Sequence, residues 1–98
     1  MHFVVSWDIS ATGEEWKQLN EAMKQPLSQY SWVRPLTTLY VVQVASQAVW
    51  DTILNALTQV SQANPSKINV IMTPLMNGGR YNGVLPPNLW DEINKRSA

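Results

Sequence analysis

The sequence predicts a single α+β domain with four short strands, two longer helices and a short C-terminal helix. Three observations support this: β-branched and aromatic runs of strand length, two stretches with the apolar period of a helix, and proline or glycine between most of these segments. A chain of 98 residues can build one sheet packed against a layer of helices. We therefore expect residues 1–98 to form one domain.

The N-terminal part is expected to be a strand over residues 2–8 followed by a helix. Apolar and mixed positions alternate along this strand, Phe3, Val5 and Trp7 on one face and Val4, Ser6 and Asp8 on the other. Thr12 and Glu15 have the spacing of a capping box. The helix that they start is expected to end or bend at Pro26.

Three more strands are predicted from β-branched runs. The first covers residues 31–34 and is stopped by Pro35, the second covers residues 37–44, and the third covers residues 67–73. The second of these is the most strand-like segment of the chain, because Thr, Tyr and Val fill most of it.

The remaining elements are two helices and a turn-rich segment. Ser46 is a good N-cap for a helix running to about Gln62, and a final short helix is expected over residues 88–96. Between residues 74 and 85 two Asn-Gly pairs predict turns. A short fifth strand or hairpin is expected around Arg80-Tyr81 or Gly83-Val84.

The order strand, helix, strand, strand, helix, strand is that of the ferredoxin-like βαββαβ fold. Its antiparallel four-stranded sheet carries both helices on one face, and right-handed crossovers put the first and third strands in the centre. The other face is left without a cover of its own. We therefore expect a partner chain on that face or along a sheet edge.

Composition excludes several classes of site. Seven basic residues balance seven acidic ones, which argues against a strongly electrostatic nucleic-acid binder, and a near-neutral charge favours self-association. Without cysteine and with a single histidine, any metal must be bound through oxygen. The chain has neither an apolar run long enough to span a membrane nor a secretion signal, so a cytoplasmic protein with no membrane partner is expected.

Asp8 is the most informative candidate residue. A carboxylate at the end of a strand on a rigid scaffold is well placed to hold a hard cation, and equally well placed to accept backbone N–H bonds in a turn. The residues alone leave both interpretations open. Ser10 and Thr12 are expected to be turn and cap residues rather than ligands.

Three short motifs, taken in order, resemble a known family. They are Trp7-Asp8-Ile9-Ser10, the segment from Arg34 to Tyr40, and the ending Gly83-Val84-Leu85-Pro86 with Trp90-Asp91-Glu92-Ile93-Asn94. Together they resemble the small CRISPR-associated nuclease and adaptation family with its SinR-like relatives. The resemblance spans most of the chain.

The resemblance implies a ferredoxin-like homodimer and a metal-dependent endonuclease or endoribonuclease. Asp8 would be the catalytic and metal-binding residue, with one carboxylate from each copy sharing Mg²⁺ or Mn²⁺. Glu14 and Glu15 stand where the family often has basic residues, and Tyr40 where it commonly has Phe. These departures imply weak or lost phosphodiesterase activity.

Trp32 beside Arg34, on an expected edge strand, is the candidate nucleic-acid contact. The other tryptophans are expected to serve core packing or dimer contacts, since few basic residues lie between them. His2 is expected to face solvent or to pack at a sheet end, and no second histidine or acid nearby in sequence indicates a role in acid–base chemistry.

Two alternatives to a nuclease remain open. One is a non-catalytic homodimeric interaction module of the mobile-element or toxin–antitoxin type, which neutral charge and abundant aromatic residues favour. The other is a dimer that holds a small molecule between sheet and helices.

Overall fold

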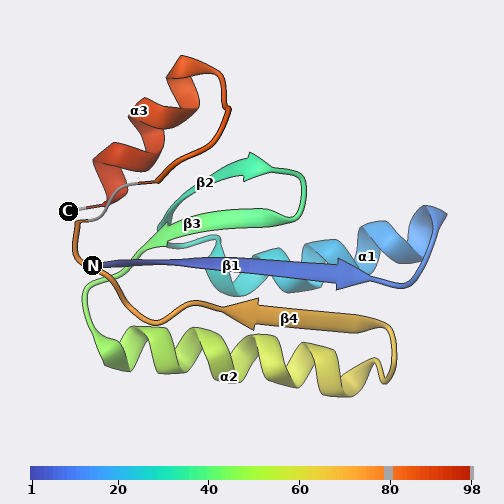
Figure 1. The fold of residues 1–98 in the computed structure, drawn as a ribbon. Helices are drawn as coiled ribbons and strands as arrows, with labels where there is room; N and C mark the ends of the chain where they lie inside the picture. The colour runs from blue at the N-terminus through green and yellow to red at the C-terminus, as the bar shows by residue number, and fades with distance from the viewer. Residues whose placement is uncertain (79–80, 98) are drawn as a thin grey trace.

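The computed structural model describes residues 1–78 and 81–97. Figure 1 shows the elements, which are β1 (His2–Ile9), α1 (Gly13–Lys24), the 3₁₀ turn η1 (Gln25–Leu27), β2 (Ser31–Leu36), β3 (Leu39–Gln43), α2 (Gln47–Ala63), β4 (Ile68–Met72) and α3 (Pro87–Arg96). The predicted order of strands and helices is confirmed. Among the described residues, no helix is long and apolar enough to cross a membrane.

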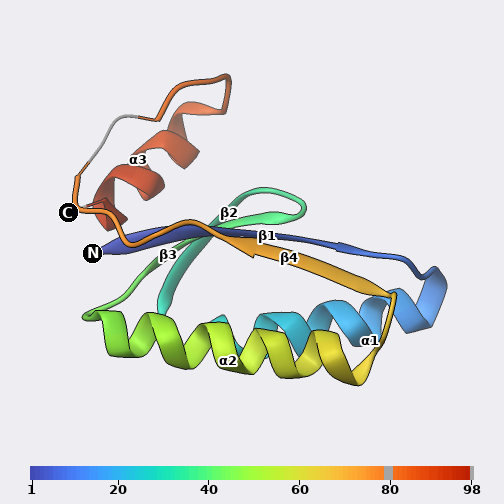
Figure 2. The ribbon, with the colours of Figure 1, turned by 60° about the horizontal axis from the view of Figure 1, so that its bottom comes forward.

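The four strands form one antiparallel sheet in the order β2-β3-β1-β4. The first and third strands are therefore central, as right-handed crossovers require. Figure 2 shows α1 and α2 side by side below the sheet and α3 above it. The chain thus has the predicted ferredoxin-like α+β fold, with one additional helix on the opposite face.

The core lies between the sheet and the pair α1 and α2. Phe3, Val5 and Trp7 of β1 are almost completely buried there, beside Met23 of α1 and Leu57 of α2. Since side chains alternate along a strand, Val4, Ser6 and Asp8 lie on the other face. The predicted alternation therefore assigns the two faces of β1 correctly.

Two predicted boundaries of the sheet are wrong. Pro35 does not stop β2, because the pairing of β2 with β3 is irregular between Val33 and Leu36 and resumes at Leu36. A proline is tolerated at such an irregularity of an edge strand, where its missing N–H breaks no ladder bond. Residues 37 and 38 form the turn between β2 and β3, so β3 begins only at Leu39.

Of the two predicted helix caps, one forms and the other does not. Ser46 caps α2 as predicted, its Oγ accepting from Val49 N at 3.4 Å. Thr12 precedes α1 in an extended conformation, but its side chain makes no capping hydrogen bond, so the predicted capping box does not form. The Glu15 carboxylate instead accepts from Lys67 Nζ at 2.6 Å.

The expectation of an uncovered second face is wrong in part. After β4 the chain crosses to that face, and α3 packs Ile93 against Val33 and Val41 to form a second, smaller core. An apolar sheet face stabilises any amphipathic segment that reaches it. The chain's own C-terminal segment, residues 81–97, therefore covers part of the surface expected for a partner.

The expected fifth strand does not form in the residues that the structure describes. His2 and Met76 make an isolated antiparallel bridge, and Gly83-Val84 is not a strand. Arg80, part of the other predicted position, lies outside the described residues. The second face beyond the C-terminal segment stays open near the C-terminal end of β1.

Candidate functional site

Asp8 is the last but one residue of β1 and lies in the strand rather than in a turn. Its side chain is exposed on the sheet face opposite α1 and α2, because its neighbour Trp7 fills the main core. On the same face the C-terminal segment covers only the start of β1, where His2 and Val4 lie. The Asp8 carboxylate is therefore open to solvent on a rigid central strand.

Asn69 of β4 is the direct cross-strand neighbour of Asp8. Hydrogen bonds from Thr73 N to Val4 O (2.9 Å) and from Ser10 N to Lys67 O (2.7 Å) mark the hydrogen-bonded pairs of this ladder. The alternation of an antiparallel ladder makes Asp8 and Asn69 such a pair as well, with Cα atoms about 5.5 Å apart. The carboxylate and the amide thus stand side by side on the open face.

The polar site around Asp8 is a shallow hollow of about 190 Å³ lined by Ser6, Trp7, Asp8, Asn69, Val70 and Ile71. It offers a carboxylate, an amide and a hydroxyl, of which the carboxylate and the amide carbonyl are oxygen donors that suit Mg²⁺ or Mn²⁺. Sequence reasoning missed Asn69. The alternation of residues 67–73 is the only sequence signal that could have identified Asn69. It identifies the neighbour of Asp8 only once the strand register is known.

No side chain or backbone N–H in the described residues donates to the Asp8 carboxylate, so the turn-capping interpretation finds no supporting bond. Within residues 1–78 and 81–97 no group of three His, Cys, Asp or Glu side chains is placed to hold a metal. One carboxylate binds a divalent ion weakly. A metal centre at Asp8 therefore requires ligands from a second copy or from a substrate.

Trp32 lies on the opposite face of the sheet from Asp8. Its ring makes an edge contact with Tyr40 (centroids 5.5 Å apart), and Tyr40 stacks on Trp7 at 4.9 Å in the main core. Lys24 Nζ of α1 lies 5.8 Å from the centre of the Trp32 ring. Trp32 is thus at the margin of the helix-covered face, where packing accounts for it.

Arg34 lies in the irregular part of β2, an edge strand as expected. Because β3 separates β2 from β1, the strand of Arg34 is two strand spacings, about 10 Å, from that of Asp8. The structure therefore does not bring the predicted site residues Asp8, Trp32 and Arg34 together in one copy.

Most basic side chains of the described residues are paired with glutamates. Lys67 pairs with Glu15, Lys24 with Glu21, and both Lys95 and Arg96 pair with Glu92. Arg34 has no such partner in the part of the chain that the structure describes. The surface around Asp8 consequently offers little free positive charge to a phosphodiester.

His2 is fully buried at the start of β1 and hydrogen-bonds the Tyr81 hydroxyl of the C-terminal segment. Burial lowers the pKa of the His2 imidazole, and the positive chain terminus lowers it further. Burial likewise raises the pKa of Tyr81. His2 thus fastens the C-terminal segment to the sheet, a role that the sequence did not predict.

Comparison with known proteins supports the fold. No family model and no curated protein matches the sequence. Among solved structures the chain is similar to Cas2 of Streptococcus pyogenes, with 16% identity, a TM-score of 0.61, and coverage of 76% of this chain and 86% of that one. It is also similar to a hypothetical protein of Thermus thermophilus, with 13% identity, a TM-score of 0.57, and coverage of 87% and 93%. The predicted resemblance to a CRISPR-associated protein is confirmed at the level of the fold.

Proposed function

We propose that this chain is a homodimeric relative of the CRISPR-associated small nucleases, in which Asp8 of each copy contributes to one metal-dependent phosphodiesterase site. The observation that carries the proposal is the exposed Asp8 carboxylate at the end of β1, which has no hydrogen-bond or ion-pair partner among the described residues, in a fold similar to that of Cas2. The packing of β1 on α1 and α2 holds the end of this strand rigidly, so it is a suitable place for a catalytic ligand.

The oxygen donors near Asp8 in one copy fit half of a metal site with oxygen ligands. Two copies related by a two-fold axis would supply two carboxylates, and the Asn69 amides could hold water or substrate oxygens beside them. A bound Mg²⁺ or Mn²⁺ would activate water and offset the charge of a phosphodiester. The chain's own contribution is to hold Asp8 in the strand ladder and to keep the amide of Asn69 next to it.

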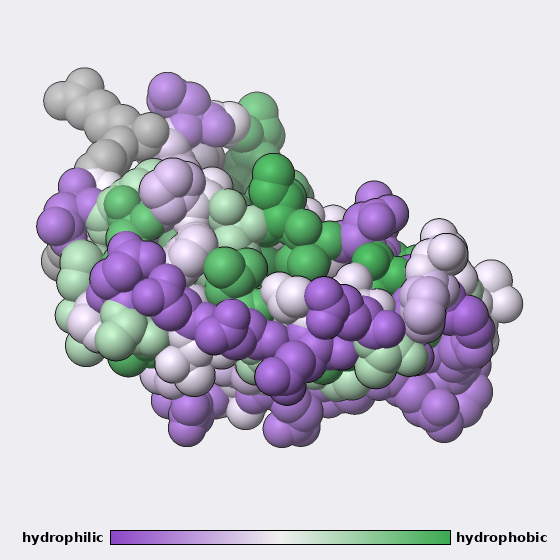
Figure 3. All heavy atoms as spheres, turned by 90° about the horizontal axis from the view of Figure 1, so that it is seen from below, coloured by the Kyte–Doolittle hydropathy of each residue, from purple (hydrophilic) through white to green (hydrophobic). Residues whose placement is uncertain are grey.

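The open sheet face also supports the two-fold arrangement. Ile71, which follows Asn69 on the same face of β4, is 72% exposed, and Leu36 of β2 is 55% exposed. Figure 3 shows apolar surface gathered above the sheet beside the C-terminal segment, with hydrophilic residues below it. Covering this surface with a second copy would bury apolar area close to Asp8.

The proposal also includes the predicted nucleic-acid contacts of Arg34 and Trp32, but away from the Asp8 site itself. Arg34, on an edge strand, has no ion-pair partner in the described part of the chain, so it could contact the backbone of a nucleic acid that extends beyond the Asp8 site. Trp32, on the other face, would be reached only by a strand that wraps around the β2 edge.

The direct test is cleavage of single-stranded RNA and duplex DNA with Mg²⁺ or Mn²⁺ by the wild-type chain, Asp8→Asn and Asp51→Asn. Asp51 is an exposed carboxylate on α2, on the far side of the sheet, and is the matched control. We expect Asp8→Asn to lose metal-dependent cleavage and Asp51→Asn to retain it. Activity that survives in Asp8→Asn, or none in the wild type, would remove the hydrolytic proposal.

The shared site has a separate geometric test. The sequence has no cysteine, so Asp8→Cys carries a single nitroxide label, and pulsed electron resonance measures the label-to-label distance in a dimer. We expect a distance at the short limit of the method. A dimer with widely separated labels would contradict a shared ion while leaving the dimer itself intact.

A non-catalytic homodimeric interaction module is the second candidate function. The exposed apolar side chains of the open face and the neutralised basic residues favour it. Sedimentation distinguishes the two candidates together with the cleavage assay: a stable dimer without cleavage supports the module, and a dimer that cleaves through Asp8 supports the nuclease.

A further inference from the structure

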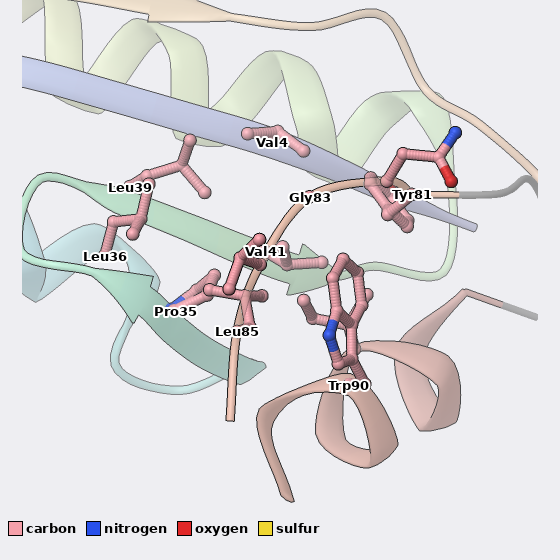
Figure 4. Close-up of a pocket in the computed structure, with 12 residues that line it drawn as sticks. Val4, Pro35, Leu36, Leu39, Val41, Tyr81, Gly83, Leu85 and Trp90 are labelled. Carbon is pink, nitrogen blue, oxygen red and sulfur yellow. The ribbon is translucent and has the colours of Figure 1, made fainter. Parts of the chain in front are cut away.

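The C-terminal segment leaves an apolar groove between itself and the open sheet face, separate from the Asp8 site. Its volume is about 280 Å³. Figure 4 shows its walls: Val4, Leu39 and Val41 of the sheet on one side, and Tyr81, Leu85 and Trp90 of the C-terminal segment on the other. This volume is close to the lower limit of small-molecule sites, which run from about 300 to 1,000 Å³.

The residues that line the groove disfavour charged ligands and polar macromolecules. Among residues 1–78 and 81–97, every side chain that lines the groove is uncharged, and nearly all are aliphatic or aromatic. A phosphate or carboxylate would lose hydration there without gaining a cation from these residues. Water is a poor occupant as well, because an ordered buried water needs two to four polar partners. The groove therefore fits an uncharged, mainly apolar molecule.

Trp90 places an indole N–H in this apolar wall, which also includes the exposed amide of Asn82. Trp7 Nε1 donates to Asn20 Oδ1 at 3.0 Å and Trp50 Nε1 donates to Thr73 O at 3.1 Å, whereas Trp90 Nε1 has no acceptor among the described residues. Figure 4 shows the nitrogen of Trp90 on the edge of the ring that faces Leu85. The Tyr81 hydroxyl is engaged by His2. Trp90 thus offers a free N–H to a ligand in the groove.

We propose that this groove binds a compact, uncharged, mainly apolar molecule that carries one hydrogen-bond acceptor, which Trp90 Nε1–H holds. Small-molecule sites usually combine an apolar cavity with a small number of placed polar groups, and here these include Trp90 Nε1–H and the Asn82 amide. The groove does not include Asp8 and requires no phosphodiesterase activity, although Leu36 both lines it and belongs to the apolar surface that a second copy is proposed to cover. It places the ligand between the sheet and α3 rather than between the sheet and the helix pair α1 and α2.

The test uses two probes, acetophenone, which has a carbonyl acceptor, and toluene, which has none. Binding is followed on the full chain by the indole N–H resonance of Trp90, assigned with Trp90→Phe, and by the methyl resonances of Leu39 and Val41. We expect saturable shifts of all three residues with acetophenone, and weaker binding of toluene. Trp90→Phe should weaken acetophenone about 3- to 10-fold, the effect of one hydrogen bond, and leave toluene nearly unchanged.

A matched pair of variants tests the location. Leu39→Trp adds bulk to the groove wall, and Leu54→Trp adds the same bulk to a half-buried position of α2 on the other side of the sheet. We expect the first to abolish binding of both probes and the second to retain it. Absence of saturable shifts in the wild type, or probe binding that survives Leu39→Trp, overturns the proposal. A Trp90 indole resonance that shifts with protein concentration but not with either probe would also overturn the proposal, because a second copy would then fill the groove.

Discussion

The two faces of the sheet are made from the same strands but serve different purposes. On the face toward α1 and α2, Phe3 and Val5 of β1 are completely buried in a continuous core. On the other face Asp8 is exposed and Val4 borders an unfilled groove. Over residues 3–8 the strand therefore carries its fully buried side chains on odd positions and the candidate chemistry on the even position Asp8.

This division has a physical reason. The buried odd positions hold β1 rigidly, so the backbone at an even position such as Asp8 is fixed although its side chain is not packed. The even face can then retain polar and unfilled surface that a packed core would not tolerate. The comparison predicts that substitutions on the two faces affect different properties.

The largest expected effect comes from deleting a core side chain of β1. Phe3→Ala should lower the free energy of unfolding by about 3–5 kcal/mol, because it removes a fully buried ring and leaves a cavity. Ser6→Ala, on the other face of the same strand, should change it by less than about 0.5 kcal/mol. Urea unfolding of both variants measures the difference. Similar losses for the two would contradict the division between the faces.

The packed face is also the part that the sequence predicts well. Alternation in residues 2–8 identifies the buried side of β1, and the helical period and Ser46 locate α2. These signals are local, and burial of an apolar stripe against a sheet leaves few alternative orientations for a strand or helix. The central position of β1 and β3 follows from the handedness of the crossovers.

The open face is predicted less well because it depends on contacts distant in sequence. Asn69 becomes the neighbour of Asp8 only through the register of β1 and β4, which no local pattern specifies. The turn signals after β4 indicate that the chain turns and not where it goes. The contact of His2 with Tyr81 joins residues 79 positions apart, so the groove beside it was not foreseen.

The next prediction concerns the attachment of the C-terminal segment to the open face. The pKa of His2 is lower in the folded chain than the usual value of 6.5. Above pH 6.5 the imidazole is neutral in both states and its hydrogen bond to Tyr81 contributes fully. As the pH falls below 6.5 and through the folded pKa, the unfolded chain binds the proton first and stability is lost.

Urea midpoints between pH 7.5 and pH 5 test this attachment. The wild type should lose stability across that range, and His2→Gln, which cannot titrate there, should show a flatter profile. The groups that face His2 are the chain terminus and Tyr81, and the latter stays protonated throughout because its pKa is raised. A profile that is equally steep in His2→Gln would assign the pH dependence to other groups.

A smaller effect is expected at Tyr40, within the packed face. Its hydroxyl is buried and has no hydrogen-bond partner in the described part of the chain. Tyr40→Phe keeps the stack on Trp7 and removes an unsatisfied polar group, so it should raise the free energy of unfolding by about 1 kcal/mol. Tyr30→Phe is the control, since the Tyr30 hydroxyl accepts from Gln29 at an exposed position. A loss of stability in Tyr40→Phe would show that the hydroxyl has a partner.

The smallest expected effect on stability, and the most useful for function, concerns the charge near Asp8. Lys67 lies two residues from Asn69, and its ammonium is 2.6 Å from the Glu15 carboxylate in an exposed pair. Glu15→Gln should cost less than about 1 kcal/mol of stability. It should raise affinity for nucleic acid at low salt and steepen the salt dependence by about one phosphate contact, because Lys67 becomes free. Glu21→Gln makes the same change of net charge beside Lys24 on the helix-covered face, so an equal gain there would mean that nucleic acid does not bind near Asp8.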